Sequence, residues 1–351
     1  MSSYATYTSL ALLGAISADL NGDGLLDLLA FNFPADDIPS DGTFVVFFGQ
    51  PDGGLGAPVS YPGGIPRGIG DLNGDGYPDV VAGTFGQGAG TYGQGGGAQV
   101  FLNDGAGGLV LSGTVTTAGE VISVGIGDLN ADGLADLALG ESSSGDIVSA
   151  EVAFGNGLGG FSAPVALPNL GYPLVVADLN QDGFPDIAAA TSDDSQLAVL
   201  LNQGDGGFRT SLYTATVAAI AVLPTSGHSP DLVLSGGQGV QVLKNSGDGT
   251  FVIGPKLQAP GGFYLAIGDF NGDCFPDVAT SFASDCTNWE ASVLYGDGDG
   301  GFAPAVSLRG IGFVGFLAAL GPVENPRALA TDTAGGCFDA GIIVYGDASK
   351  P

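Results

Sequence analysis

One short phrase recurs along the chain and constrains its fold more than any other feature. It reads DLNGDGLLDLLA from Asp19, DLNGDGYPDVVA from Asp71, DLNADGLADLAL from Asp128, DLNQDGFPDIAA from Asp178 and DFNGDCFPDVAT from Asp269. The last interval is nearly twice the others and contains a degenerate fifth copy, LPTSGHSPDLVL, from Leu223. One more period leads to LGPVENPRALAT from Leu320, without matching acids. Seven copies at about 50 residues indicate a repeat architecture.

Each repeat also contains further apolar runs separated by turns. A second phrase lies between the anchors, as in QVFLNDGAGGL, AVLLNQGDGGF and SVLYGDGDGGF. Each period then contains four short strands joined by an Asp-rich turn, a variable loop and a Gly-rich turn. The 64 glycines suit such turns and disfavour long helices. The sequence therefore predicts an all-β fold, a seven-bladed β-propeller with four antiparallel strands per blade.

The two ends of the chain predict how the blades close. The seventh repeat stops at GIIVYGDASKP, after its third strand, whereas the N-terminal YATYTSL resembles a fourth strand. We expect this N-terminal strand to complete the last blade beside the C-terminal strand, which removes a free sheet edge. Residues 1–351 are therefore predicted to form a single domain.

The Asp-rich turns have the composition of a calcium site. Asp, Asn, Asp, a backbone carbonyl and Asp stand at positions 1, 3, 5, 7 and 9, and glycine at position 6 allows a sharp turn. Hard oxygen ligands in this number suit Ca²⁺ better than Mg²⁺ or Zn²⁺. The predicted ligands of about five ions are Asp19, Asn21, Asp23, Leu25, Asp27; Asp71, Asn73, Asp75, Tyr77, Asp79; Asp128, Asn130, Asp132, Leu134, Asp136; Asp178, Asn180, Asp182, Phe184, Asp186; and Asp269, Asn271, Asp273, Phe275, Asp277.

These turns differ from an EF-hand. Position 12 is Ala, Leu or Thr rather than Glu, and the residues after position 9 are typical of a strand. The predicted ion therefore lies in a β-hairpin. The alternative is five ordinary Asx-Gly turns. Cys274 replaces the position-6 glycine of the last turn, where a left-handed residue costs about 1–2 kcal/mol, so this site is expected to be the weakest.

The anchors resemble the FG-GAP/VCBS repeat of integrin α-subunit propellers, and also the related calcium-binding mushroom propeller lectins. The resemblance extends over the whole chain at the level of the repeat. It implies a seven-bladed propeller with calcium in the hairpins between first and second strands, held by the Asp and Asn residues named above.

Charge and hydropathy exclude several partners. With 37 acids against 7 Lys and Arg, the formal charge is −30, which opposes electrostatic binding to nucleic acid or anionic membrane. No apolar run is long enough to insert into a membrane. The N-terminus has no basic region, so no signal peptide is expected in this sequence. The resemblance nevertheless implies an extracellular or cell-surface location.

The sequence favours binding over catalysis. His228 is the single histidine, so no Ser-His-Asp triad can form without it, and no phosphate-binding loop is present. We expect no enzymatic activity and no catalytic residues. The main hypothesis is a calcium-stabilised module that binds a glycan, as a lectin does, or mediates adhesion. The alternative is a protein-binding adhesion or scaffold module, and the third is a hydrolase or lyase acting on polysaccharides. The oligomeric state is not predicted.

Ligand recognition is assigned to the variable loops between second and third strands, which lie opposite the Asp-rich turns. One of them, SFASDCTNWEASV, contains Trp289, the only tryptophan. An exposed Trp beside polar residues can stack on a sugar ring, so Trp289 is the candidate ligand-binding residue. The alternative is a tryptophan packed between blades.

The three cysteines predict one disulfide. When SVLYGDG is aligned with IIVYGDA, Cys286 and Cys337 occupy nearly the same loop position in consecutive repeats. A Cys286–Cys337 bond is therefore predicted, with Cys274 free at the other end of the blade. Such a bond indicates an oxidising compartment. The alternative is three unpaired thiols.

Overall fold

The structure is a computed structural model. It describes residues 6–7, 11–33, 42–51, 54–84, 96–143, 147–225, 227–236, 239–257, 259, 261–262, 264–285, 288–298, 300–308, 317–322, 328–332 and 342–346. Every regular element in these ranges is a β-strand, in agreement with the all-β prediction. In this part of the chain, no helix is long and apolar enough to cross a membrane.

The chain divides into two compact units. The first comprises Met1–Pro66, Ser235–Val240 and Lys256–Pro351, and the second comprises Arg67–Leu234 and Gln241–Pro255. One domain over residues 1–351 stays a prediction.

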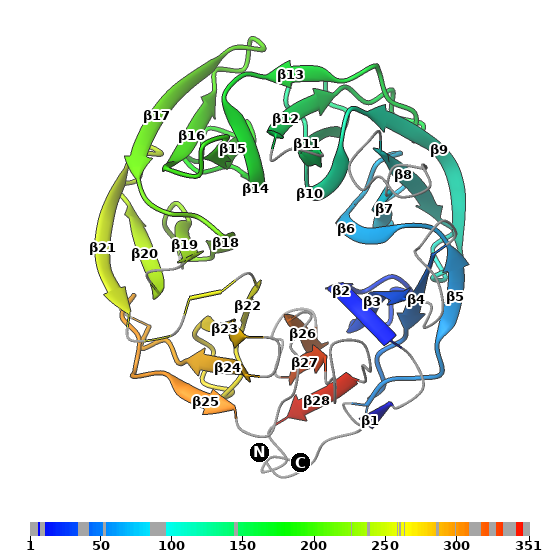
Figure 1. Ribbon diagram of the computed structural model, residues 1–351. Coiled ribbons are helices and arrows are strands. Elements are labelled where there is room, and N and C mark those ends of the chain that lie inside the picture. Colours follow the sequence, from blue (N-terminus) through cyan, green and yellow to red (C-terminus); the bar gives the residue numbers. More distant parts are fainter. Residues whose placement is uncertain are drawn as a thin grey trace. The chain divides into compact units, whose positions relative to one another are not determined.

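The second unit consists of four-stranded sheets in which the strands pair in chain order (Figure 1). The first sheet has β6 (Ile65–Gly70), β7 (Asp79–Thr84), β8 (Gly96–Asn103) and β9 (Leu109–Thr117). The next has β10 (Glu120–Gly127), β11 (Asp136–Ser143), β12 (Ile147–Ala153) and β13 (Val165–Leu167). A third has β14 (Leu170–Ala177), β15 (Asp186–Thr191), β16 (Gln196–Asn202) and β17 (Phe208–Thr214). Most of a fourth follows, with β18 (Ala219–Leu223), β19 (Asp231–Gly236), β20 (Gly239–Asn245) and β21 (Phe251–Leu257).

The first unit contains one four-stranded sheet and one of eight strands. The smaller sheet has β22 (Tyr264–Gly268), β23 (Asp277–Asp285), β24 (Asn288–Leu294) and β25 (Val306–Leu308). Four strands of the larger sheet come from the first repeat: β2 (Ala11–Ala18), β3 (Leu25–Phe33), β4 (Thr43–Phe47) and β5 (Val59–Pro62). The others are β26 (Leu317–Pro322), β27 (Ala328–Asp332), β28 (Ile342–Gly346) and β1 (Thr6–Tyr7).

The prediction of seven separate four-stranded blades is therefore wrong, because the described strands form six sheets. The eight-stranded sheet arises where β26 pairs with β3, through Gly321 opposite Leu26 and Pro322 opposite Leu25. In the intact repeats the matching residues belong to the Asp-rich turn. The seventh repeat lacks the acids of that turn, and the end of β26 pairs with the first repeat. The predicted pairing of the N-terminal strand is present, with Thr6 opposite Ile343 in β28.

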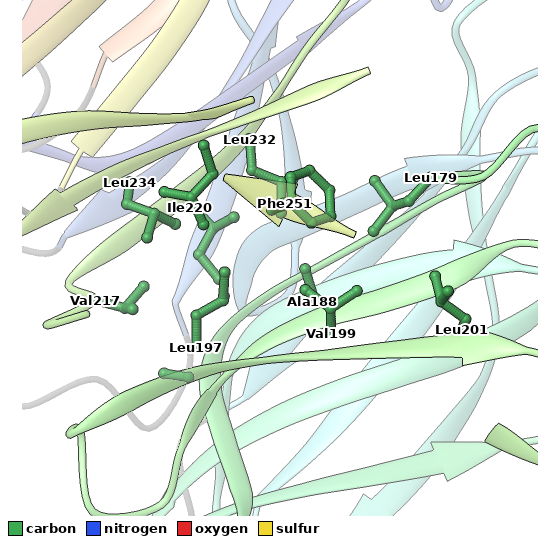
Figure 2. Packing of buried hydrophobic residues seen from close by; sticks show 12 residues of the cluster. Leu179, Ala188, Leu197, Val199, Leu201, Val217, Ile220, Leu232, Leu234 and Phe251 are labelled. Atoms are coloured by element: carbon green, nitrogen blue, oxygen red, sulfur yellow. The ribbon is translucent and has the colours of Figure 1, made fainter. Parts of the chain in front are cut away.

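The inner strands are buried on both faces, which explains their continuous apolar runs. In β16, Leu197, Val199 and Leu201 pack into one cluster, whereas Ala198 and Leu200 pack into another on the opposite face. This alternation follows from the two-residue period of a strand. Figure 2 shows the first cluster, in which side chains from β15 and β16 meet those from β18 and β19.

The fourth strands are more exposed than the inner ones. In β17, four of seven residues are exposed and none is buried, whereas six of seven residues in β16 are buried. Each sheet thus provides a buried support for the turns at its ends, and those turns include the candidate site.

Candidate metal-binding loops

Five hairpins join the first and second strands of their sheets, where the sequence places them. We call residues 19–27, 71–79, 128–136, 178–186 and 269–277 the Asp loops. They connect β2 to β3, β6 to β7, β10 to β11, β14 to β15 and β22 to β23. Position 6 has a positive φ in all five, including Cys274 at 72°, which confirms the predicted left-handed conformation.

The Asp at position 1 organises each loop by accepting backbone N–H groups. In the first loop, Asp19 Oδ1 accepts from Gly22 N at 2.7 Å and Asp23 N at 3.1 Å, and Oδ2 accepts from Gly24 N at 2.8 Å. The bonds from positions 5 and 6 recur in the four other loops. The carboxylate therefore sits inside the turn, bound by amides that follow it.

Positions 3 and 5 form a second recurrent contact. In the second loop, Asn73 Nδ2 donates to Asp75 Oδ2 at 2.8 Å, and Asp75 Oδ1 accepts from Tyr77 N at 2.9 Å. All five loops have this arrangement. The side-chain oxygens at positions 1, 3 and 5 are thus gathered around one tight turn.

The Asp at position 9 is buried and connects the loop to the next turn. Asp27 is 0% exposed, and its Oδ2 accepts from Leu20 N at 2.9 Å while its Oδ1 accepts from Gly49 N at 2.8 Å. The same two bonds recur in the other loops. Asp loops and Gly-rich turns therefore lie at the same end of each sheet.

Burial and like charges make each loop electrostatically costly. Burial raises the pKa of Asp27 to about 6, and the carboxylates of Asp23 and Asp19 push it in the same direction against two backbone N–H groups. The pKa values of Asp186 and Asp277 are also raised to about 6 by burial, with the same contribution from neighbouring acids. Among the described residues, no basic side chain forms an ion pair with these acids. A bound cation would supply the missing positive charge.

The loops fit Ca²⁺ by donor type, although their acids already have other contacts. Within the described part of the chain, no three His, Cys, Asp or Glu side chains form a group that could hold a metal ion. Both carboxylate oxygens of the Asp at position 9 accept backbone N–H groups, so this residue contributes the fewest free oxygens to a metal ion. The donors around the turn are carboxylate and amide oxygens, which Ca²⁺ prefers. Binding would require some carboxylate contacts with N–H groups to be exchanged for the ion.

The other predicted site residues lie largely beyond the described part of the structure. Trp289 belongs to β24 and pairs with Ala283, but its side chain is outside the described residues. Cys286 and Cys337 are also outside them, so the disulfide stays a prediction. Cys274 is exposed and free, as predicted.

The structure adds an ion pair that sequence reasoning missed. In the fifth loop (residues 223–231), Asp231 occupies position 9 and is buried, and Lys244 Nζ donates to its Oδ2 at 2.8 Å. Asn245 N donates to Oδ1 at 2.8 Å, as the matching residue does in the Asp loops. Lys244 stands where the five intact repeats have Phe48, Leu102, Phe154, Leu201 and Tyr295. That change of residue type was the available signal.

A buried pair of glutamates was also missed. Glu141 in β11 is 0% exposed, and its Oε2 accepts from Gly119 N at 2.9 Å. Glu151 in β12 lies diagonally across the strand pair, because Leu139 is opposite Glu151 and Glu141 is opposite Ser149. Burial, followed by the adjacent Glu151 carboxyl, raises the pKa of Glu141 to about 8. Only the strand register reveals this pair.

The comparisons with known proteins agree with the repeat and the fold. An FG-GAP-like repeat model matches residues 19–82, 71–139 and 228–280. No curated protein sequence matches the chain.

Three solved structures share the fold at low sequence identity. One is an Agrocybe aegerita lectin that recognises non-reducing terminal N-acetylglucosamine, at 18% identity and TM-score 0.53, over 86% of this chain and 81% of that chain. Another is BBS1N in complex with ARL6DN, at 12% identity and TM-score 0.59, over 98% and 94%. The periplasmic gluconolactonase PpgL of Pseudomonas aeruginosa has 15% identity and TM-score 0.54, over 91% and 87%. The chain is therefore a β-propeller that contains FG-GAP-like repeats.

Proposed function

We propose that this protein is a non-enzymatic binding module whose Asp loops hold about five Ca²⁺ ions and whose ligand is a glycan. The observation that carries the calcium proposal is the fivefold recurrence of one loop geometry, in which oxygens of positions 1, 3 and 5 surround a turn. The ions would neutralise the clustered carboxylates and hold the turns in place, without taking part in a reaction.

The glycan proposal draws on the fold and the charge. A lectin with this fold recognises a sugar, and likeness at this identity supports the scaffold rather than the site. The formal charge of −30 opposes anionic ligands. Neutral sugars have hydroxyl and amide groups that can donate hydrogen bonds to carboxylates. An extracellular or cell-surface location fits such a role.

A protein ligand is the second candidate. BBS1N, which has this fold, was solved in complex with ARL6DN, and this likeness supports a protein-binding role for the scaffold. An enzymatic role is the third candidate, because the gluconolactonase PpgL shares the fold.

A glycan array separates these candidates. The protein should be applied in calcium and again after chelation. A thermal denaturation curve under each condition shows whether the protein is folded. Binding of neutral glycans that falls on chelation supports the proposal. An array without signal, together with a protein that stays folded and saturates with calcium, would exclude the glycan role and leave the calcium role standing.

A further inference from the structure

Three Asp loops carry an aromatic residue at position 7, and each ring lies on a glycine of the adjacent Gly-rich turn. The pairs are Tyr77 with Gly105, Phe184 with Gly204 and Phe275 with Gly298. Both members of each pair belong to one sheet, since the Asp loop precedes the second strand and the Gly-rich turn follows the third. The same structural unit therefore repeats in three sheets.

The ring of Tyr77 lies flat on the backbone. A Cβ atom built on Gly105 would be 2.6 Å from Cζ, 2.7 Å from Cε2 and 2.9 Å from Cε1. A point nearly equidistant from three adjacent ring carbons lies over the ring face, not beyond its edge. The rings of Phe184 and Phe275 have the same relation to Gly204 and Gly298. One face of each ring is therefore covered by glycine.

The rings of two of these pairs are nevertheless exposed. Tyr77 is 43% exposed and Phe275 is 42% exposed, although one face of each ring is covered. Phe184 is less exposed than these two. Two rings therefore lie against a glycine of the turn while presenting apolar surface to solvent.

An Asp precedes the glycine under each of these two rings, and one of its carboxylate oxygens accepts a backbone N–H of the same turn. Asp104 precedes Gly105 and Asp297 precedes Gly298, and both Asp residues are exposed. An aromatic face beside a carboxylate complements a pyranose, which has an apolar C–H face and hydroxyl donors at its edge. The carboxylates and the net charge of −30 oppose uronic, sulfated or sialylated sugars. A single ring is also far smaller than the roughly 800 Å² that a stable protein partner covers.

We propose that Tyr77 and Phe275 are stacking platforms for neutral pyranose rings, one in each of two sheets. This inference rests on the glycan-binding role proposed above and names residues for it. It places recognition at the end of the sheets that carries the Asp loops, whereas Trp289 was assigned to the opposite end. Calcium in the loops would fix the backbone from which Tyr77 and Phe275 project.

The test is a calorimetric titration in calcium. Wild-type protein and the Tyr77→Ala/Phe275→Ala variant are each titrated with tri-N-acetylchitotriose, maltotriose and xylotriose. Loss of both rings should weaken binding of the recognised trisaccharide about tenfold or more. Tyr77→Phe keeps the ring without the hydroxyl and should bind more tightly than Tyr77→Ala. Leu158→Ala removes an exposed apolar side chain, 76% exposed, from a Gly-rich turn without a ring, and serves as the control.

Leu134→Phe provides an independent test, because it should add a binding site, and a misfolded variant could not produce that gain. Leu134 occupies position 7 and lies against Gly157, so a ring there should create a further platform and raise the stoichiometry. Wild-type binding that survives in the double variant would overturn the platforms and leave glycan binding elsewhere. Absence of binding by the wild type to all three probes would overturn both the platforms and the glycan role.

Discussion

The five Asp loops and the loop of the fifth repeat, residues 223–231, both provide hydrogen-bond donors for a buried Asp, but with different groups. In both, a buried Asp at position 9 accepts a backbone N–H on Oδ1. In the Asp loops, Oδ2 accepts the N–H of position 2, whereas the fifth loop has Pro224 there, and proline has no N–H. Lys244 Nζ donates to Asp231 Oδ2 instead. The lysine thus replaces a missing donor and also supplies a positive charge.

The difference shows what the Asp loops lack. The fifth loop has Leu223, Thr225 and Gly227 at positions 1, 3 and 5, so its single acid is balanced by one ammonium group. Each Asp loop retains three acids, and the described residues provide no basic side chain to balance them. Among the loops that the structure describes, an internal cation is present only where the acids that could bind an external one are absent.

The largest expected effect is that of calcium removal. An ion bound only by the folded state stabilises it by about 2.7 kcal/mol per site at a hundredfold excess over Kd. Chelation should therefore lower the melting temperature sharply. Hydrogen exchange should increase in the five Asp loops and stay constant in residues 223–231. Equal exchange in all six loops would contradict the distinction between them.

Removal of the internal cation should have a smaller effect that calcium does not influence. Lys244→Met leaves one oxygen of buried Asp231 without its donor and should cost about 2 kcal/mol, in calcium and in chelator alike. Urea denaturation measures this loss. Adding Pro224→Leu restores an N–H at position 2 and should recover part of the stability. If Lys244→Met/Pro224→Leu is no more stable than Lys244→Met, Lys244 does not compensate for the missing N–H of Pro224.

Glu141 sharpens the comparison, because it is a buried acid with neither a cation nor a lysine on it. The side chain that acts on its pKa is Glu151 on β12, whereas Arg67 on β6 acts on Glu120 of β10. Its folded pKa of about 8 exceeds the unfolded value of 4.5, so the folded state retains a proton that the unfolded state releases.

Stability should therefore fall as pH rises from about 4.5 to 8 and level off above that range. Glu141→Gln keeps a neutral side chain at every pH and should flatten this slope. Denaturation midpoints at several pH values, in excess calcium, measure both proteins. Parallel pH profiles of variant and wild type would refute the assignment of the proton to Glu141.

The smallest expected effect concerns Cys274. Its φ of 72° is a left-handed conformation that glycine adopts without strain, so Cys274→Gly should stabilise the protein by about 1 kcal/mol. The Asp269–Asp277 loop should also be the first to lose calcium in the wild type. A calcium titration monitored by hydrogen exchange tests the order of release, and simultaneous release from all loops would contradict it.

The sequence was sufficient for features whose determinants are local. Alternating Asp, Asn and Gly residues predicted the Asp loops and the left-handed position 6, because each turn is built from its own nine residues. Long-range pairing was not predictable in the same way. The contact of β26 with β3 consists of two residue pairs from opposite ends of the chain. The Glu141–Glu151 pair and the Lys244–Asp231 pair both depend on which residues of neighbouring strands lie together. The aligned phrases show the aromatic residues at position 7, but they do not show that each ring packs against a glycine of the Gly-rich turn.

The most direct measurement of the central claim is the number of calcium ions per chain. Native mass spectrometry of the folded protein in calcium should find five ions, and Asp71→Asn/Asp75→Asn should reduce the number to four. Lys244→Met should leave it at five, since the fifth loop has no further acids to bind an ion. A protein that carries no calcium, or that gains an ion when Lys244 is removed, would contradict the division between the five Asp loops and the fifth.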